Sequence, residues 1–151
     1  MNITTRTMTA NDIANVAQLF DLYRQFYEQP ANPQLAYDFI HDRFTLGESI
    51  IMVAESVEAG LLGFCQLYPT FCSVEAAPIY SLYDLFVLPE ARKSGAGRLL
   101  LLAAEARAAT DGKVRMDLTT AKTNLSAQSL YEALGWVRDE VFYAYNKQVG
   151  S

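Results

Sequence analysis

A glycine turn is the first group of residues whose types could do chemistry. The run Arg92-Lys93-Ser94-Gly95-Ala96-Gly97-Arg98 follows the apolar segment Leu85-Phe86-Val87 and precedes a strongly helix-forming segment. Free N–H groups at a helix start attract anions, and glycine lets a phosphate approach the backbone without a Cβ in the way. The run also carries three positive side chains. It predicts a binding site for ligand phosphates, with tight packing of a helix on a sheet as the alternative interpretation.

Two familiar phosphate-binding patterns do not fit this turn. A P-loop needs Gly-x-x-x-x-Gly-Lys-Ser/Thr, but Lys93 and Ser94 precede the paired glycines instead of following them. The dinucleotide pattern Gly-x-Gly-x-x-Gly lacks its third glycine, because Leu100 stands three residues after Gly97. The sequence therefore argues against both a P-loop and a Rossmann site.

Metal chemistry is not predicted. Cys65 and Cys72 lie in one apolar stretch without a histidine nearby, which fits neither a disulfide framework nor zinc-ligand spacing. We interpret them as free thiols. The one histidine, His41, falls on a predicted helix, where a solvated side chain is the expected role.

Size and composition predict one soluble domain that spans residues 1–151. The chain is 51% hydrophobic and 19% charged, with a net charge of −5, far from the regime of disordered chains. No apolar run is long enough to span a membrane, and no secretory signal is recognisable at the start. We therefore expect a cytoplasmic protein without a membrane partner.

Charge is divided unevenly along the chain. Residues 1–91 hold eleven acids and three bases, whereas residues 92–151 hold nine bases and six acids. The acidic total argues against a nucleic-acid partner, because phosphates dominate that affinity. A basic part beside an acidic part suits an anionic cofactor next to a cationic substrate, with accidental surface composition as the alternative.

The elements that position the glycine turn alternate between helix and strand. Helical spacing and capping signals predict helices after Thr9, from Pro33 to about Arg43, over 95–109 and over 126–134. Strands are predicted at 3–6, 50–54, 63–71, 79–87, 114–119 and 141–145. Short loops favour an antiparallel meander, and the crossover between the strands at 79–87 and 114–119 makes that pair parallel. The fold class is therefore α/β or α+β, with helices flanking a mixed sheet.

Two motifs resemble the GNAT family of N-acetyltransferases. The family's pyrophosphate signature, Arg/Gln-x-x-Gly-x-Gly/Ala after a strand ending in Val-x-Pro, is matched by Arg92 to Gly97 after Val87-Leu88-Pro89. A second family motif, Asn-x-x-Ala/Ser-x-x-Leu-Tyr-x-x-x-Gly-Phe/Trp, is matched by residues 124–136. The order of predicted elements also agrees over nearly the whole chain. A short Asp84-Leu-Phe-Val run is similar to the polyamine and histone acetyltransferase subgroup.

The resemblance implies a mostly antiparallel sheet with a splayed pair of parallel strands, and acetyl-CoA as co-substrate between them. Its pantetheine would bond to the main chain of Leu85, Phe86 and Val87. The pyrophosphate would rest on the turn of Lys93, Ser94, Gly95, Ala96, Gly97 and Arg98, beside Arg92. Asn124 and Ser126 would flank the pantetheine from the other side.

The resemblance also nominates groups for acetyl transfer by direct attack of an amine. Tyr131 falls on the tyrosine that donates a proton to the CoA sulfur, with a core tyrosine as the alternative. The thioester carbonyl would be polarised by the N–H of Phe86 or Val87. Where some family members carry a glutamate base, this chain has Ser81 or Tyr83.

Three routes remain open for the proton that the amine loses. Asp84 is the one acid on its predicted strand, and strand alternation places it on the face opposite Ser81 and Tyr83, where it either supports loop backbone or acts in catalysis. Glu28, at the end of the first helix, is the second candidate. Relay through water to several acids is the third.

The acceptor is expected at the acidic first two helices, with Tyr27, Glu28 and Tyr83 as substrate-binding residues. A cationic small-molecule amine, a protein lysine and a peptide N-terminus all remain open. Family members often pair their last strands across a dimer, so a homodimer is a further expectation. The rival hypothesis is an acyl-CoA-binding sensor domain of the same fold that performs no transfer.

Overall fold

The computed structural model describes residues 2–150 and divides the chain into two compact units, Met1–Thr119 and Thr120–Ser151. The first unit holds one sheet of five strands in the spatial order β1-β2-β3-β4-β5. Neighbours are antiparallel except β4 and β5, which run parallel. The strands are β1 (Thr4–Thr7), β2 (Ile50–Ser56), β3 (Gly60–Cys72), β4 (Ala77–Val87) and β5 (Met116–Asp117).

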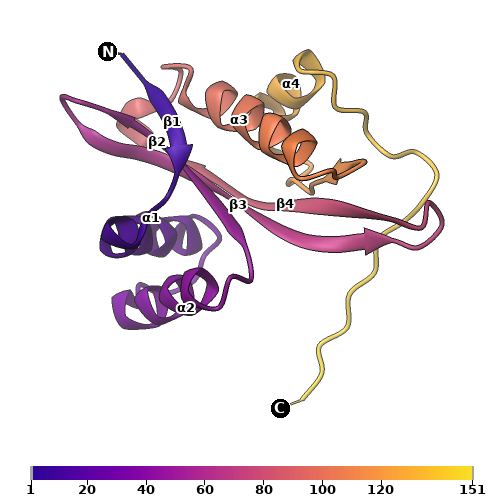
Figure 1. The fold of residues 1–151 in the computed structure, drawn as a ribbon, viewed down its shortest axis with the longest axis horizontal. Coiled ribbons are helices and arrows are strands. Elements are labelled where there is room, and N and C mark those ends of the chain that lie inside the picture. The colour runs from indigo at the N-terminus through magenta and orange to yellow at the C-terminus, as the bar shows by residue number, and fades with distance from the viewer. Residues whose placement is uncertain (1, 151) are drawn as a thin grey trace. The chain divides into compact units, whose positions relative to one another are not determined.

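Helices cover both faces of this sheet. Helices α1 and α2 lie on one side and α3 lies on the other (Figure 1). The helices of the first unit are α1 (Ile13–Phe26), α2 (Pro33–Thr45) and α3 (Ala96–Thr110), with short 3-10 turns η1 (Ala10–Asp12) and η2 (Pro89–Ala91). The mixed α/β fold and the antiparallel meander that the sequence predicts are therefore confirmed.

The first two helices begin where local side chains satisfy free backbone donors. The Thr9 N–H donates to the Asp12 carboxylate at 2.7 Å, in the predicted capping pattern. The residues between them form the turn η1, so α1 starts later, at Ile13. Asn32 accepts a bond from the Leu35 N–H at 3.1 Å, and Pro33 occupies the first position of α2.

Apolar side chains fill the space on both faces of the sheet. Under α1 and α2 one buried cluster includes Phe20, Ile40, Val53, Phe64 and Phe86. On the opposite face α3 turns its own buried side chains to the strands, namely Leu100, Leu101, Ala104 and Ala108. Burial of two full faces is the main source of stability for a sheet of this kind.

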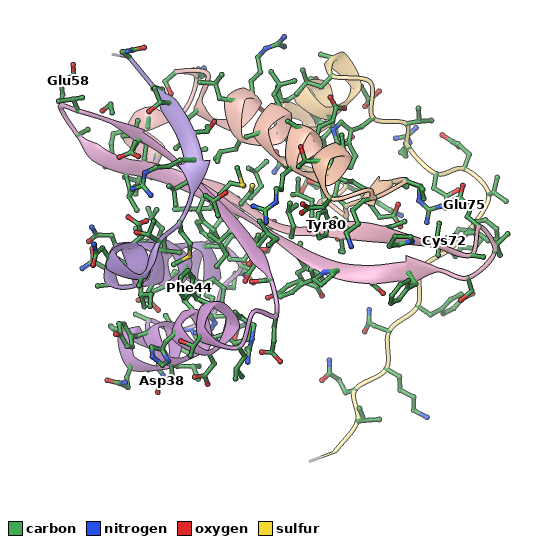
Figure 2. All side chains as sticks on the ribbon, viewed as in Figure 1. Asp38, Phe44, Glu58, Cys72, Glu75 and Tyr80 are labelled. Carbon is green, nitrogen blue, oxygen red and sulfur yellow. The ribbon has the colours of Figure 1, made fainter. Side chains whose placement is uncertain are left out.

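Polar contacts fix the crossover from β4 through α3 to β5. The Tyr80 hydroxyl on β4 donates to Asp111 after α3, and Arg107 bonds the same carboxylate at 2.8 Å. Figure 2 shows Tyr80 beside this end of α3, with Cys72 and Glu75 at the β3–β4 hairpin. Arg115 reaches that hairpin and bonds Glu75 at 3.1 Å. The parallel pair is confirmed, although the strand predicted at 114–119 is only Met116–Asp117.

The second unit contains α4 (Leu125–Ala133), which begins at the expected Asn124 cap. The Asn124 side chain accepts a bond from the Ala127 N–H at 3.2 Å. The strand predicted at 141–145 is wrong, because residues 136–150 form neither helix nor strand. Alternating apolar residues form a strand only where another strand supplies backbone partners, and none of the five strands pairs with residues 141–145. Val141, Phe142, Tyr143 and Tyr145 are accordingly exposed.

No helix among residues 2–150 has the length and apolar character that a bilayer crossing requires. The same described residues contain no cluster of three or more side chains suited to hold a metal ion.

Candidate functional site

A β-bulge interrupts β4 at Tyr83. Gln66 on β3 pairs with Asp84, and the next residue, Leu67, pairs with Leu82, so Tyr83 is an extra residue on its strand. A bulge of this kind inserts one residue and bends the strand. It therefore also changes the edge of β4 toward which the N–H and C=O groups of the residues after Tyr83 point.

Hydrogen bonds on either side of the bulge show this change directly. The Tyr80 N–H donates to Arg115 in front of β5 at 3.1 Å, whereas the Leu88 N–H donates to Leu62 on β3 at 2.8 Å. The two residues are an even number of positions apart, so in an uninterrupted strand both would face the same edge. The bulge reverses the edge, and Leu85 and Val87 consequently face away from β3.

Leu85 and Val87 face the edge of β4 that β5 leaves. Strand β5 pairs with β4 only through Tyr80 with Met116 and Ser81 with Asp117, and beyond Ser81 the two strands diverge. A cavity of about 80 Å³ lies at the point of divergence, lined by Ser81, Leu82, Tyr83, Asp117, Leu118 and Thr119. The backbone groups of Leu85 and Val87 thus border an open strand edge, where an extended ligand can bond as a strand would.

This register revises the expectation for the carbonyl-polarising amide. Phe86 pairs with Phe64, and its N–H faces β3, as that of Leu88 does. Of the two expected donors only Val87 therefore points to the open edge, and Leu85 joins it there. The Phe86 ring is buried in the core under α1.

The glycine turn adopts a conformation suited to an anion. Lys93 and Gly95 both have positive φ, at 64° and 95°, and Gly95 is the residue before the first turn of α3. The first-turn amides of an α-helix lack an intrahelical acceptor, so those of Gly97 and Arg98 point out of the helix start. Ser94 is folded back, since its hydroxyl donates to the Ala91 carbonyl.

Arg92 lies at this turn, but its guanidinium is turned to the end of β4. Its Nε donates to the Val87 carbonyl at 3.1 Å, and the guanidinium carbon lies 5.6 Å from the Phe26 ring and 5.8 Å from the Phe86 ring. These contacts join the turn, β4 and α1. Arg92 therefore holds the turn in place while the backbone of the turn faces outward.

A buried polar chain lies on the α1 face of the sheet. Gln66, fully buried, donates from Nε2 to the Asp84 carboxylate and accepts at Oε1 from the Ser49 hydroxyl at 2.7 Å. The Tyr23 hydroxyl donates to the Tyr83 carbonyl at 3.2 Å and also interacts with the Asp84 carboxyl. Both residues at the bulge are therefore held by side chains from other elements.

The face predicted for Asp84 is wrong, and the bulge is the reason. Ser81 pairs with Tyr68 and Asp84 pairs with Gln66, and these two β3 residues lie two apart, on one face. Ser81 and Asp84 therefore share the face under α1. Burial raises the pKa of the Asp84 carboxyl above its usual value, and the bonds from Gln66 and Tyr23 oppose part of that rise.

Aromatic rings gather near the C-terminal end of α1 and the bulge. Tyr27 contacts Tyr23 with ring centroids 5.2 Å apart, and Tyr83 contacts Tyr68 edge-on at 5.5 Å. Tyr83 is 69% exposed. Glu28 follows α1 in a left-handed conformation, with φ of 64°, and is also exposed. The expected acceptor residues thus present ring faces and one carboxylate to solvent.

The second unit carries the remaining predicted residues. Tyr131 lies on α4 with its ring 6.1 Å from that of Trp136, and Ser126 lies in the first turn of the same helix. Asn124 uses its side-chain oxygen to cap α4.

A sequence model of the acetyltransferase (GNAT) family matches residues 16–136. The chain belongs to this family. Among its GNAT relatives, the uncharacterized N-acetyltransferase YhfO of Bacillus subtilis strain 168 is 44% identical over 145 residues, covering 96% of this chain and 95% of YhfO.

Solved GNAT structures agree with this assignment. The crystal structure of a probable acetyltransferase is 34% identical, with a TM-score of 0.89 over 100% of this chain and 99% of the other. The aminoglycoside N-acetyltransferase AAC(6')-Iy was solved with a CoA-linked bisubstrate analogue and is 18% identical to this chain. Its TM-score is 0.80, over 99% of this chain and 100% of AAC(6')-Iy, so the two proteins share the fold. The chain is thus a GNAT acetyltransferase.

Three residues shape this GNAT site in ways that sequence reasoning did not predict. Gln66 and Tyr23 hold the bulge, and Gly63 lets β4 pass close to β3. Gln66 is the polar side chain in the otherwise apolar stretch at 61–67, and that position was the signal that could have predicted a buried hydrogen-bonding role for it. The other two depend on a strand register that no local pattern specifies.

Proposed function

We propose that this chain transfers an acetyl group from acetyl-CoA to a primary amine by direct attack, as a single N-acetyltransferase domain of residues 1–151. The observation that carries the proposal is the open edge of β4, where the backbone of Leu85 and Val87 borders the divergence from β5. A pantetheine amide chain pairs with such an edge in the manner of a missing strand. The pyrophosphate then lies at the start of α3.

The chemistry follows from these placements. The neutral amine nitrogen attacks the thioester carbonyl carbon, a C–N bond forms, and the C–S bond breaks. The carbonyl oxygen, which becomes negative, is stabilised by the N–H of Leu85 or Val87. The departing thiolate takes a proton from the Tyr131 hydroxyl, and the proton lost by the amine passes to an acid or to water.

Two carboxyls are candidates to accept the amine's proton, and burial separates them. Asp84 is 3% exposed and bonded to Gln66, so its first role is to support the bulge. Glu28 is exposed and has ready access to water. We assign proton removal to water that exchanges with acids such as Glu28.

The acceptor is assigned to the class of cationic amines. Exposed rings at Tyr27 and Tyr83 attract an ammonium through their faces, and the first 91 residues are strongly acidic. A small polyamine-like molecule and a protein lysine both satisfy this chemistry. AAC(6')-Iy, a fold relative, acts on aminoglycosides, which are also polycationic amines.

The first test is thermal unfolding with acetyl-CoA, ATP and NAD in parallel. A ligand at about 100 times its Kd adds roughly 2.7 kcal/mol, which for a chain of this size raises Tm by roughly 5–10 °C. We expect a shift with acetyl-CoA alone. Gly97→Asp should remove it by placing a carboxylate at the anion site, whereas Gly60→Asn, at the start of β3, should retain it.

The second test is release of free CoA thiol with a panel of diamines, amino sugars and lysine peptides. Acetyl-CoA binding with thiol release for at least one cationic amine supports the transferase. Binding without release across the panel supports the sensor hypothesis instead. The absence of any acetyl-CoA shift at saturation would overturn both.

A further inference from the structure

The hydroxyl of Tyr23 is aimed at the bulge by the packing of its ring. The ring lies among those of Phe20, Phe64 and Phe86, with centroids 6.1, 6.0 and 6.3 Å away. From this site on α1 the hydroxyl reaches the Tyr83 carbonyl at 3.2 Å. Because burial raises the pKa of Tyr23, the hydroxyl stays protonated and remains a donor.

The carbonyl that Tyr23 bonds belongs to the extra residue of β4. Tyr83 has no partner on β3 in the register, whereas Asp84 is paired with Gln66 and bonded to its side chain. Tyr23 therefore supplies a bond that the strand ladder does not. A bulged residue without such a bond has a freer peptide plane.

The orientation of this peptide determines which edge the following backbone groups face. Tyr80 and Leu88 face opposite edges only because one residue is inserted between them. If the bulge were lost, or moved past Leu85, the N–H of Leu85 would turn from the open edge toward β3. The bond from Tyr23 disfavours that slippage.

We propose that Tyr23 is a positioning residue for acetyl transfer: its bond to the Tyr83 carbonyl fixes the bulge and thereby holds the N–H groups of Leu85 and Val87 toward the open edge, where one of them meets the thioester carbonyl. The inference rests on the proposed function, because it needs acetyl-CoA at the open edge of β4. It assigns to α1 a part in catalysis besides forming the acceptor wall. Tyr23 itself does not touch the reacting atoms in this assignment.

The test is Tyr23→Phe, which keeps the ring and removes only the hydroxyl. We expect kcat to fall about 10-fold. The Kd of CoA, which keeps the pantetheine but has no thioester carbonyl, should rise less than kcat falls. Tyr37→Phe, on α2, is the matched control and should leave kcat unchanged. Retained CoA binding also demonstrates that the variant is folded.

A spectroscopic measurement separates positioning from a general structural effect. The carbonyl stretch of acetyl-CoA labelled with ¹³C at the carbonyl should shift on binding to the wild-type protein and move back toward its free value in Tyr23→Phe. An unchanged stretch, or kcat within twofold of wild type, would overturn the positioning role while leaving the proposed function intact. Failure of the wild-type protein to bind acetyl-CoA would overturn both.

Discussion

Gly63 on β3 faces the carbonyl oxygen of Phe86 so closely that a Cβ at this glycine would lie 2.6 Å from that oxygen. The neighbouring contact is also tight, with Val87 Cα at 3.2 Å. Both atoms belong to the backbone of β4, at the segment that carries the open edge. The close approach thus holds the segment of β4 that carries the open edge directly against β3.

Gly63→Ala should therefore destabilise the protein and disturb acetyl-CoA binding together. The backbone of β4 must move to admit the methyl group, and overpacking of this kind typically raises the free energy of the native state by about 1–3 kcal/mol. Thermal unfolding and acetyl-CoA titration measure the two effects. Gly47→Asn, with positive φ and open space, is the control and should change little. A fully stable Gly63→Ala would contradict the close approach.

The pair of Arg6 and Asp12 predicts a loss of stability in acid. Two bonds, at 2.7 and 2.9 Å, join the guanidinium to the carboxylate, and the bond from Arg6 is the main reason that the pKa of Asp12 is lowered to about 2. The unfolded chain titrates near 4, so the stabilisation is complete above about pH 4 and is lost as pH falls toward 2.

Asp12→Asn tests this linkage. Because Arg6 is 40% exposed, we expect the variant to lose of the order of 1 kcal/mol at pH 7. The difference from wild type should shrink between pH 4 and pH 2 in urea unfolding curves. Asp38→Asn, on the exposed face of α2, should show no such trend. A difference that stays constant down to pH 2 would refute the assignment.

The two thiols should differ sharply in reactivity. Cys65 is fully buried, and burial raises its pKa to about 12, whereas Cys72 is partly exposed with Sγ 3.6 Å from Arg115. Iodoacetamide at pH 8 should therefore give one adduct per native chain and two per unfolded chain, by mass. In Cys72→Ser the native protein should gain none. Rapid native alkylation of that variant would show that Cys65 is accessible.

Much of this fold follows from short stretches of sequence. The caps at Thr9 and Asn32, the three-stranded meander and the helix after Gly95 are all local patterns, and the structure confirms each. The parallel pairing of β4 and β5 follows from the length of the crossover. These features depend on neighbours in sequence or on simple connection rules.

The features that escape prediction depend on how two strands meet. The residues Leu82 to Leu85 read as simple alternation, and only the pairing with β3 reveals Tyr83 as the extra residue. That single insertion places Asp84 on the face opposite to the predicted one. It also turns the N–H of Leu85, instead of that of Phe86, toward the open edge. The strand expected at 141–145 is absent for a related reason, since no strand of the sheet pairs with those residues.

The roles proposed for Tyr131 and Asp84 predict unequal effects of two conservative substitutions. Tyr131→Phe removes the proposed proton donor to the thiolate and should lower kcat about 10- to 100-fold, with the Kd of acetyl-CoA within about threefold. Asp84→Asn keeps an oxygen that can accept the bond from Gln66 Nε2 and should lower kcat less than about threefold. Because burial raises the pKa of Asp84, a neutral side chain is favoured at this position. The Asp84→Asn protein should therefore have a Tm equal to or higher than that of the wild-type protein at pH 8. Steady-state thiol release and thermal unfolding provide both comparisons. A loss of kcat in Asp84→Asn as large as that in Tyr131→Phe would instead identify Asp84 as the base, and retention of kcat in Tyr131→Phe would remove the tyrosine from the mechanism.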